Sequence, residues 1–148
     1  EAGCDDALVG IGQPGRLALE FTREAESARA ALQSALVDVK RAIPSARLVE
    51  AAPDFVGLTD VAEIIGVSRQ NMRKLMLAHP GSFPAPVHEG SASIWHLADV
   101  LAWLQAKGSY ELGQDILEVA EATLQVNVVR EKRRLSGPFP KELEILAV

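Results

Sequence analysis

A chain of 148 residues is long enough for one or two small domains, and 48% hydrophobic with 24% charged residues is typical of a folded protein. A single cysteine, Cys4, excludes an internal disulfide and a metal site built on paired cysteines. No apolar run approaches the roughly 20 residues that span a membrane, and acidic residues stand where a signal peptide has its basic start. We therefore expect a cytoplasmic protein.

The net charge of −5 is unevenly distributed along the sequence. Residues 1–57 carry 6 basic and 9 acidic groups (−3), residues 58–107 carry 4 and 4 (0), and residues 108–148 carry 5 and 7 (−2). Within the neutral segment, residues 68–80 contain Arg69, Arg73 and Lys74 and no acidic residue. The overall acidity limits non-specific affinity for phosphate but leaves room for a local basic surface.

The N-terminal residues 1–53 are expected to form a small α/β unit for dimerisation or partner binding. Residues 7–12 and 16–21 favour two strands around a proline–glycine turn, which could pair as a hairpin. Apolar residues three and four apart predict a helix over 23–43, capped by Thr22 and stopped by Pro44. Residues 47–51 are a further strand candidate. Because a β-β-α-β unit of this size buries little, we expect it to lean on a partner surface or a second copy.

Residues 58–76, with the sequence LTDVAEIIGVSRQNMRKLM, predict two short helices joined by a tight turn. Thr59 is expected to cap the first helix, Gly66 to end it in the left-handed conformation, and Ser68 to cap the second. The second helix then presents side chains that can read base edges, since arginine suits guanine and glutamine or asparagine suits adenine. These side chains are Arg69, Gln70, Asn71, Arg73 and Lys74, and the capping residues Thr59 and Ser68 are further candidate DNA contacts. The alternative is a solvated helix of an all-α domain.

Residues 83–95 predict a strand, a glycine turn and a return strand that ends on a buried Trp95, followed by a helix over 96–104. A hairpin directly after such a helix is able to reach the DNA backbone or the minor groove. His88, Ser91 and Ser93 are its candidate contacts. Contact there is limited to hydroxyl and backbone donors, because Glu89 repels phosphate.

The stretch from Gly57 to Leu104 resembles the winged helix-turn-helix of the MerR superfamily, closest to its AlpA-like and excisionase-like members. The resemblance covers about a third of the chain and rests on three blocks: residues 58–70, Phe83-Pro84 with Pro86 and Gly90, and Trp95 with residues 99–100 and 103–104. It implies sequence-specific DNA binding, with residues 68–74 as recognition helix and 88–93 as wing. Relatives commonly carry arginine or lysine in the wing, which this chain lacks.

Residues 114–135 predict a second long helix, followed by a stop at 137–140 and a short tail. Its expected apolar face consists of Ile116, Val119, Ala120, Leu124, Val128 and Leu135. A second basic cluster near its end contains Arg130, Lys132, Arg133 and Arg134. This cluster is either a solvated helix end, where cations are favoured, or a second contact to the DNA backbone. In MerR-like proteins a helix after the wing often joins two subunits, so the resemblance implies a homodimer.

The sequence therefore predicts an α+β protein with a β-β-α-β unit (1–53), a winged helix-turn-helix (54–107) and a C-terminal helix and tail (108–148). We expect a dimeric transcriptional regulator or excisionase-like architectural protein, bacterial or phage, that binds double-stranded DNA without catalysis. No metal or cofactor is expected, since the three histidines are scattered and Ser93, His96 and Asp99 are too crowded for a catalytic triad. The alternative is an interaction module, such as an antitoxin or phage-defence adaptor, on the same scaffold.

Overall fold

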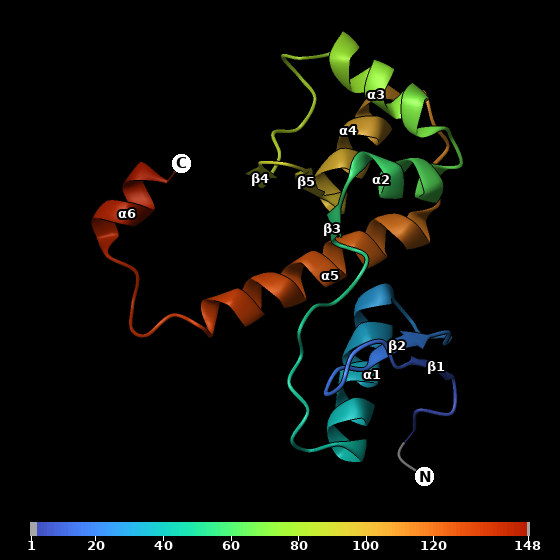
Figure 1. Ribbon diagram of the computed structural model, residues 1–148, viewed down its shortest axis with the longest axis vertical. Helices are drawn as coiled ribbons and strands as arrows, with labels where there is room; N and C mark the ends of the chain where they lie inside the picture. The colour runs from blue at the N-terminus through green and yellow to red at the C-terminus, as the bar shows by residue number, and fades with distance from the viewer. Residues whose placement is uncertain (1–2, 148) are drawn as a thin grey trace.

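The computed structural model describes residues 3–147; residues 1–2 and 148, at the ends of the predicted N-terminal unit and C-terminal tail, lie outside this part. The described residues form an α+β fold, which confirms the predicted class. The elements are β1 (Ala7–Gly10), β2 (Ala18–Phe21), α1 (Ala28–Ala42), β3 (Phe55–Val56), α2 (Leu58–Ile65), α3 (Arg69–Ala78), β4 (His88–Glu89), β5 (Ser93–His96), α4 (Leu97–Lys107), α5 (Gln114–Lys132) and α6 (Lys141–Leu146). The long helix α5 separates α2–α4 from the hairpin and α1, and α6 stands apart (Figure 1).

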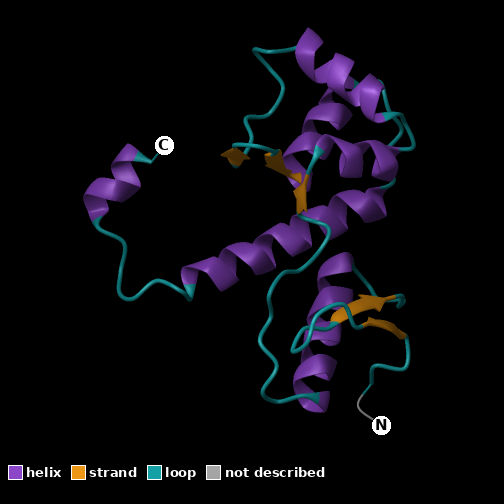
Figure 2. Cartoon of the chain, viewed as in Figure 1, coloured by secondary structure: helices purple, strands orange, loops and turns teal. Residues whose placement is uncertain are grey.

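The predicted N-terminal hairpin is confirmed, although its strands are shorter than expected (Figure 2). β1 and β2 pair antiparallel, with Ala7 opposite Phe21 and Gly10 opposite Ala18. The next helix, α1, begins at Ala28 and not at residue 23, and its cap is the Ser27 hydroxyl, which accepts from the Ala30 N–H at 3.1 Å. The predicted Thr22 cap is wrong because the Thr22 N–H donates to the Asp6 carbonyl and so continues the hairpin.

The predicted strand over residues 47–51 is absent, so the order is β-β-α and not β-β-α-β. This segment has no neighbouring strand; at its end, the N–H and carbonyl of Ala51 bind the side-chain amide of Asn127 instead. The small N-terminal unit leans on α5 of the same chain, since α1 packs against that helix. At this contact the Arg29 guanidinium donates to Gln125 Oε1 at 2.7 Å.

Helices α2 and α3 are joined by the turn 66–68, as the sequence predicts. Gly66 adopts φ +73°, the left-handed conformation that favours glycine, and the Ser68 hydroxyl accepts from the Asn71 N–H at 3.2 Å. The cap predicted for Thr59 is wrong, because α2 begins at Leu58 and Thr59 is already its second residue. Gly57 is the N-cap, and its N–H donates to the Asp60 carboxylate at 2.7 Å.

The hairpin predicted after α3 is present and has a third strand that the sequence did not predict. β4 pairs with β5, placing His88 opposite Ile94, and β3 pairs with the other edge of β5, placing Val56 opposite Trp95. The sheet order is therefore β3-β5-β4. α4 follows directly and ends at Gly108, which has φ +67°. Through β3, this three-stranded sheet is attached to the segment that precedes α2.

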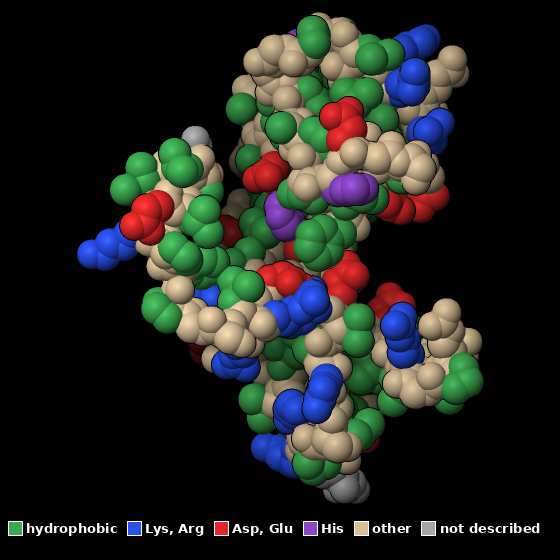
Figure 3. Space-filling view, turned by 60° about the vertical axis from the view of Figure 1, so that its left-hand side comes forward, with side chains coloured by type: hydrophobic (Ala, Val, Ile, Leu, Met, Phe, Trp, Pro, Cys, Tyr) green, Lys and Arg blue, Asp and Glu red, His purple; other side chains and the backbone are tan. Residues whose placement is uncertain are grey.

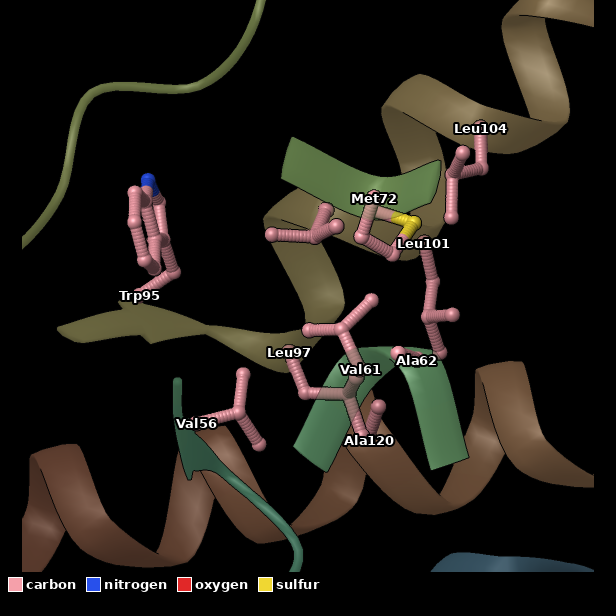
Figure 4. Packing of buried hydrophobic residues seen from close by; sticks show 10 residues of the cluster. Val56, Val61, Ala62, Met72, Trp95, Leu97, Leu101, Leu104 and Ala120 are labelled. Atoms are coloured by element: carbon pink, nitrogen blue, oxygen red, sulfur yellow. The ribbon is translucent and has the colours of Figure 1, made fainter. Parts of the chain in front are cut away.

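One apolar core joins α2, α3, α4 and α5 (Figure 4). Burial of such side chains is the main favourable contribution to folding, about 1.5–3 kcal/mol for each large one. Its fully or almost fully buried members are Val61 and Ala62 from α2, Met72 from α3, Leu97, Val100, Leu101 and Leu104 from α4, and Ala120 from α5. The elements around this core, from β3 to α4, are called the middle unit below. Since Ala120 belongs to the same core, α5 is part of the middle unit and also supports α1.

The C-terminal helix differs from its prediction in length and in its buried face. α5 ends at Lys132, and Val128 and Leu135 of the expected apolar face are each 54% exposed. α5 contacts both α4 and α1, so its buried residues are Ala120, Ala122, Thr123 and Asn127. The predicted tail contains the short helix α6. Within residues 3–147, no helix is long and apolar enough to cross a lipid bilayer.

Candidate nucleic-acid interface

Helix α3 is fixed to the core on one side and exposed on the other. Met72 is fully buried, and Leu75 and Met76 are half-buried against the core, as the sequence predicts. The outward face carries the polar residues predicted to read DNA, all of them exposed: Arg69, Gln70, Asn71, Arg73 and Lys74. Because residues four apart share a face of a helix, Arg69 lies next to Arg73, and Gln70 lies next to Lys74.

The three cations of α3 are available to a ligand. Among the residues that the structure describes, none of them forms an ion pair, and the first turn of α3 contains no acidic residue. Figure 3 shows lysine and arginine side chains along the right edge of the upper end of the molecule, where α3 lies, and others over its lower half. The ten residues of α3 make a helix about 15 Å long and about 10–12 Å across, a diameter that fits a major groove about 12 Å wide.

The hairpin β4–β5 adds polar groups but no cation. His88 and Ser91 are exposed, whereas Ser93 lies in β5 and is only partly exposed. The His88 ring lies against Gly90, where an added Cβ would be 2.7 Å from His88 Nε2. No lysine or arginine occurs between Lys74 and Lys107. Any positive charge at this interface therefore comes mainly from α3.

An aromatic cluster, which the sequence did not predict, attaches the loop after α3 to the rest of the unit. The Trp95 indole N–H donates to the Pro84 carbonyl at 3.0 Å, and the Trp103 indole N–H donates to the Ser82 hydroxyl at 3.3 Å. The Phe83 ring packs edge-on against both indoles, with ring centroids 5.9 Å and 5.0 Å away. The loop is thus held against β5 and α4, and the position of the hairpin relative to α3 is fixed.

The remaining predicted site residues lie elsewhere. Thr59 is exposed in the first turn of α2. The second basic cluster is at the C-terminal end of α5, on the opposite side of the molecule from α3 (Figure 1). Glu131 partly neutralises this cluster, since it pairs with Arg130 and, at 3.1 Å, with Arg134. Lys132 and Arg133 are exposed and form no ion pair within residues 3–147. The structure therefore does not join the two basic clusters into one surface.

A buried polar network connects the sheet to α5. Asp54 has no exposed surface; its carboxylate lies 2.7 Å from His96 Nδ1 and accepts from the Asn127 amide at 2.8 Å. The Thr123 hydroxyl donates to the Pro53 carbonyl at 2.7 Å. The network partners of Asn127 are more than 70 positions away in sequence, so no local pattern could predict them. The network satisfies every polar group it buries and fixes the segment between α1 and α2.

Within the described residues, no three histidine, cysteine, aspartate or glutamate side chains gather in a way that could hold a metal ion. No protein-family model, curated protein or solved structure matches the chain. The resemblance of residues 57–104 to MerR-like domains therefore stays a prediction from the residues themselves.

Proposed function

We propose that residues 57–107 form a winged helix-turn-helix that binds double-stranded DNA in the cytoplasm, with α3 in the major groove and β4–β5 as the wing. One observation carries this proposal. Arg69, Arg73 and Lys74 of α3 are exposed and without ion-pair partners in the described structure, whereas Met72 of the same helix is fully buried. A helix held in this way offers its polar face to a ligand without any rearrangement of the core.

The side chains of α3 suit both parts of DNA recognition. The guanidinium groups of Arg69 and Arg73 can each donate two hydrogen bonds to guanine, and the amides of Gln70 and Asn71 match adenine. The ammonium group of Lys74 can bind backbone phosphate, which positions the protein without reading sequence. The wing offers hydroxyl and backbone donors. Such an interface reads bases more than it attracts phosphate, which fits a non-catalytic regulator of transcription or an excisionase-like architectural protein.

The proposal is tested by selection from a pool of random double-stranded DNA, followed by binding measurements on the selected site. We expect Arg69→Ala and Arg73→Ala each to weaken specific binding by about fivefold or more, because loss of a bidentate contact to guanine costs about 1–3 kcal/mol. Arg16→Ala, which removes an exposed arginine near the N-terminal hairpin, is the matched control and should leave affinity unchanged. Selection of no sequence, or equal affinity for all three variants, would exclude this mode of binding.

The salt dependence gives a second measure of the same interface. With three cations on α3, the slope of log K against log salt should be no steeper than about −3 per protomer, because each neutralised phosphate contributes about −0.9. Lys74→Ala should reduce the slope by about one while the preferred sequence stays the same. A much steeper slope would place cations outside α3, such as the cluster at the end of α5, on the DNA.

The second candidate function is a protein-interaction module, and a different observation favours it. The N-terminal hairpin exposes large aliphatic side chains, with Leu8 70%, Val9 61% and Ile11 79% exposed. Exposed apolar patches often mark sites of protein–protein interaction. If this is the working surface, a partner protein should co-purify in stoichiometric amount and be lost in the Leu8→Ser/Val9→Ser variant. Arg69→Ala and Arg73→Ala would then retain the partner, and no DNA sequence would be enriched.

A further inference from the structure

We propose that this chain dimerises by exchange of its C-terminal arms, with α6 of each protomer docked in an apolar groove of the other. The arm is the segment from residue 136 to 147, and the groove lies beside the C-terminal end of α5. This arrangement explains two features together. The leucine face of α6 and the apolar groove are both left uncovered by the fold of one chain. The proposal concerns a second copy of this chain and does not rest on DNA binding.

The first feature is helix α6, which is amphipathic and exposed along its whole described length. Leu143 and Leu146 are three residues apart and therefore share one face of the helix; they are 56% and 78% exposed. Glu142 and Glu144 flank this leucine face on its two sides. A helix of six residues is far too short to be stable alone in water, so a surface that buries the leucine face is needed to hold it.

The second feature is a groove of about 660 Å³, within the range of cavities that bury a ligand. Its walls come from β3, from His96 at the end of β5, from α5 and from the segment between α5 and α6, and most of their exposed area is apolar. The apolar lining residues are Phe55, Val128, Leu135 and Phe139, of which Val128 and Leu135 are 54% exposed. Lys132 and Arg134 also line the groove.

The charges of the helix and the groove are complementary. The leucine face of α6 is flanked by two glutamates, and the groove carries two cations. Glu131, the acidic residue of the groove, is already paired with Arg130 and Arg134, whereas Lys132 has no ion-pair partner within residues 3–147. Lys132 is therefore the cation most available to a glutamate of α6, and Glu142 or Glu144 can approach it without displacing an existing ion pair.

A second copy is a better occupant of the groove than the protomer's own α6. Phe139 forms part of the groove wall, and only Pro140 separates it from the first residue of α6. Proline fixes φ near −65°, so this one-residue connection leaves little freedom for α6 to fold back into the groove that Phe139 lines. In Figure 1 the arm leads away from α5, with α6 clear of the other elements. Reciprocal exchange about a twofold axis fills two grooves and leaves no open end for further growth.

The first test is the mass of the full chain in solution over a range of concentrations, measured by sedimentation velocity. We expect a dimer that dissociates on dilution, and a dissociation constant at least tenfold higher for Leu143→Ser/Leu146→Ser. Ile145→Ser is the matched control, because Ile145 is 74% exposed on the same helix but lies off the leucine face. A monomeric wild type, or a dimer that both variants leave equally stable, overturns the proposal.

The second test uses charge reversal. Lys132→Glu should weaken the dimer, because it places like charges against α6, and Lys132→Glu/Glu142→Lys or Lys132→Glu/Glu144→Lys should restore part of the loss. Circular dichroism of each variant reports whether the fold is intact. Recovery by neither double variant contradicts the proposed pairing of groove and helix.

The third test distinguishes exchange between chains from docking within one chain. In a Cys4→Ser background, Val128→Cys and Leu146→Cys are placed in separate chains of different mass, mixed, and treated with a short bismaleimide. We expect a mixed cross-linked product, which the mixture forms only if the arm of one chain reaches the groove of the other. A chain carrying both cysteines that cross-links only within itself would show that α6 occupies its own groove, and no cross-link in either case would show that it occupies neither.

Discussion

The middle unit and the N-terminal unit of this chain both pack against α5, but they bury very different amounts of apolar surface. Around α4, side chains such as Val61, Met72 and Leu101 have no exposed surface. In the unit of β1, β2 and α1, the one buried hydrophobic residue within the secondary structure is Ala35, whereas Leu8 and Ile11 are 70% and 79% exposed. The N-terminal unit must therefore be stabilised in another way.

Arg23 supplies much of what the N-terminal unit lacks in apolar burial. Its guanidinium binds the Asp6 carboxylate through two hydrogen bonds, at 2.7 Å and 2.8 Å, and the Asp38 carboxylate at 3.0 Å. It also lies 4.7 Å from the centre of the Phe21 ring. These contacts join the N-terminal segment, the hairpin and α1. Ion pairs respond to pH and salt, whereas apolar burial does not, so the two units should respond differently to the same perturbation.

The largest expected effect follows removal of a core side chain. Leu101→Ala should lower the free energy of unfolding by about 2–5 kcal/mol, because it leaves a cavity where α2, α3 and α4 meet. Urea denaturation followed by tryptophan fluorescence measures this loss, since both tryptophans, Trp95 and Trp103, lie in the middle unit. The control Leu77→Ala, at a leucine that is 60% exposed, should change stability by less than about 0.5 kcal/mol. Equal losses would mean that Leu101 is not part of the cooperative core.

A smaller effect is expected at the network that joins the two units. Asn127→Ala removes three hydrogen bonds, two to the Ala51 backbone and one to the Asp54 carboxylate, and a typical hydrogen bond contributes about 0.5–1.5 kcal/mol net to stability. The loss should also free residues 43–54, which amide hydrogen exchange would detect as faster exchange at Ala51. Val129→Ala, at a valine of the same helix that is 51% exposed, is the control. Unchanged exchange at Ala51 would contradict the assigned hydrogen bonds.

Acid should loosen the N-terminal unit before the middle unit. The hydrogen bonds from Arg23 hold the pKa of the Asp6 carboxyl below its ordinary value of 3.8. This stabilisation is fully present above pH 3.8 and is lost as the pH falls further, through the lowered pKa of the folded protein. We expect NMR chemical shifts of residues 7–21 to change in that range while the Trp95 indole resonance stays constant. Asp6→Asn should abolish the pH-dependent change, and simultaneous changes in both units would argue against separate stabilisation.

The smallest effect on stability is expected for the exposed cations of α3. Arg73→Ala should change the melting temperature only slightly, by an amount equivalent to less than about 0.5 kcal/mol, because Arg73 is exposed and has no ion-pair partner in the described structure. Arg23→Ala is the informative comparison, since it removes an arginine that binds two carboxylates and should melt the hairpin at lower temperature. A large loss with Arg73→Ala would mean that this side chain serves the fold and not a ligand.

The sequence predicted the elements whose causes are local. Gly66 and Ser68 could be placed because a left-handed helix end and a side-chain cap each depend on one residue type at one position. The buried face of α3 followed from the spacing of Met72, Leu75 and Met76. For the same reason, the exposure of the five polar side chains of α3 that form the candidate site was predicted.

Apart from the Thr59 cap, which Gly57 and Asp60 replace locally, the main errors occurred where distant residues decide the local structure. Arg23 is bound to Asp6 and so remains outside α1, although the apolar spacing favours a helix there. The 47–51 segment has strand-like composition, but its last residue binds the Asn127 side chain and not a strand. β3 has only two residues and exists because β5 offers a free edge. Likewise, the indoles that brace the loop after α3 depend on contacts across the fold.

The double attachment of α5 also has a geometric consequence. Its 19 residues form one continuous rod about 28 Å long, with Ala120 in the middle unit and Asn127 bound to the chain that follows the N-terminal unit. Because a helix turns by about 100° for each residue, insertion of a single residue between these positions would rotate one unit around the rod relative to the other. For the proposed DNA complex, the length of this helix thus sets the side of the duplex on which the exposed N-terminal hairpin stands, and the neighbouring molecules that it can meet there.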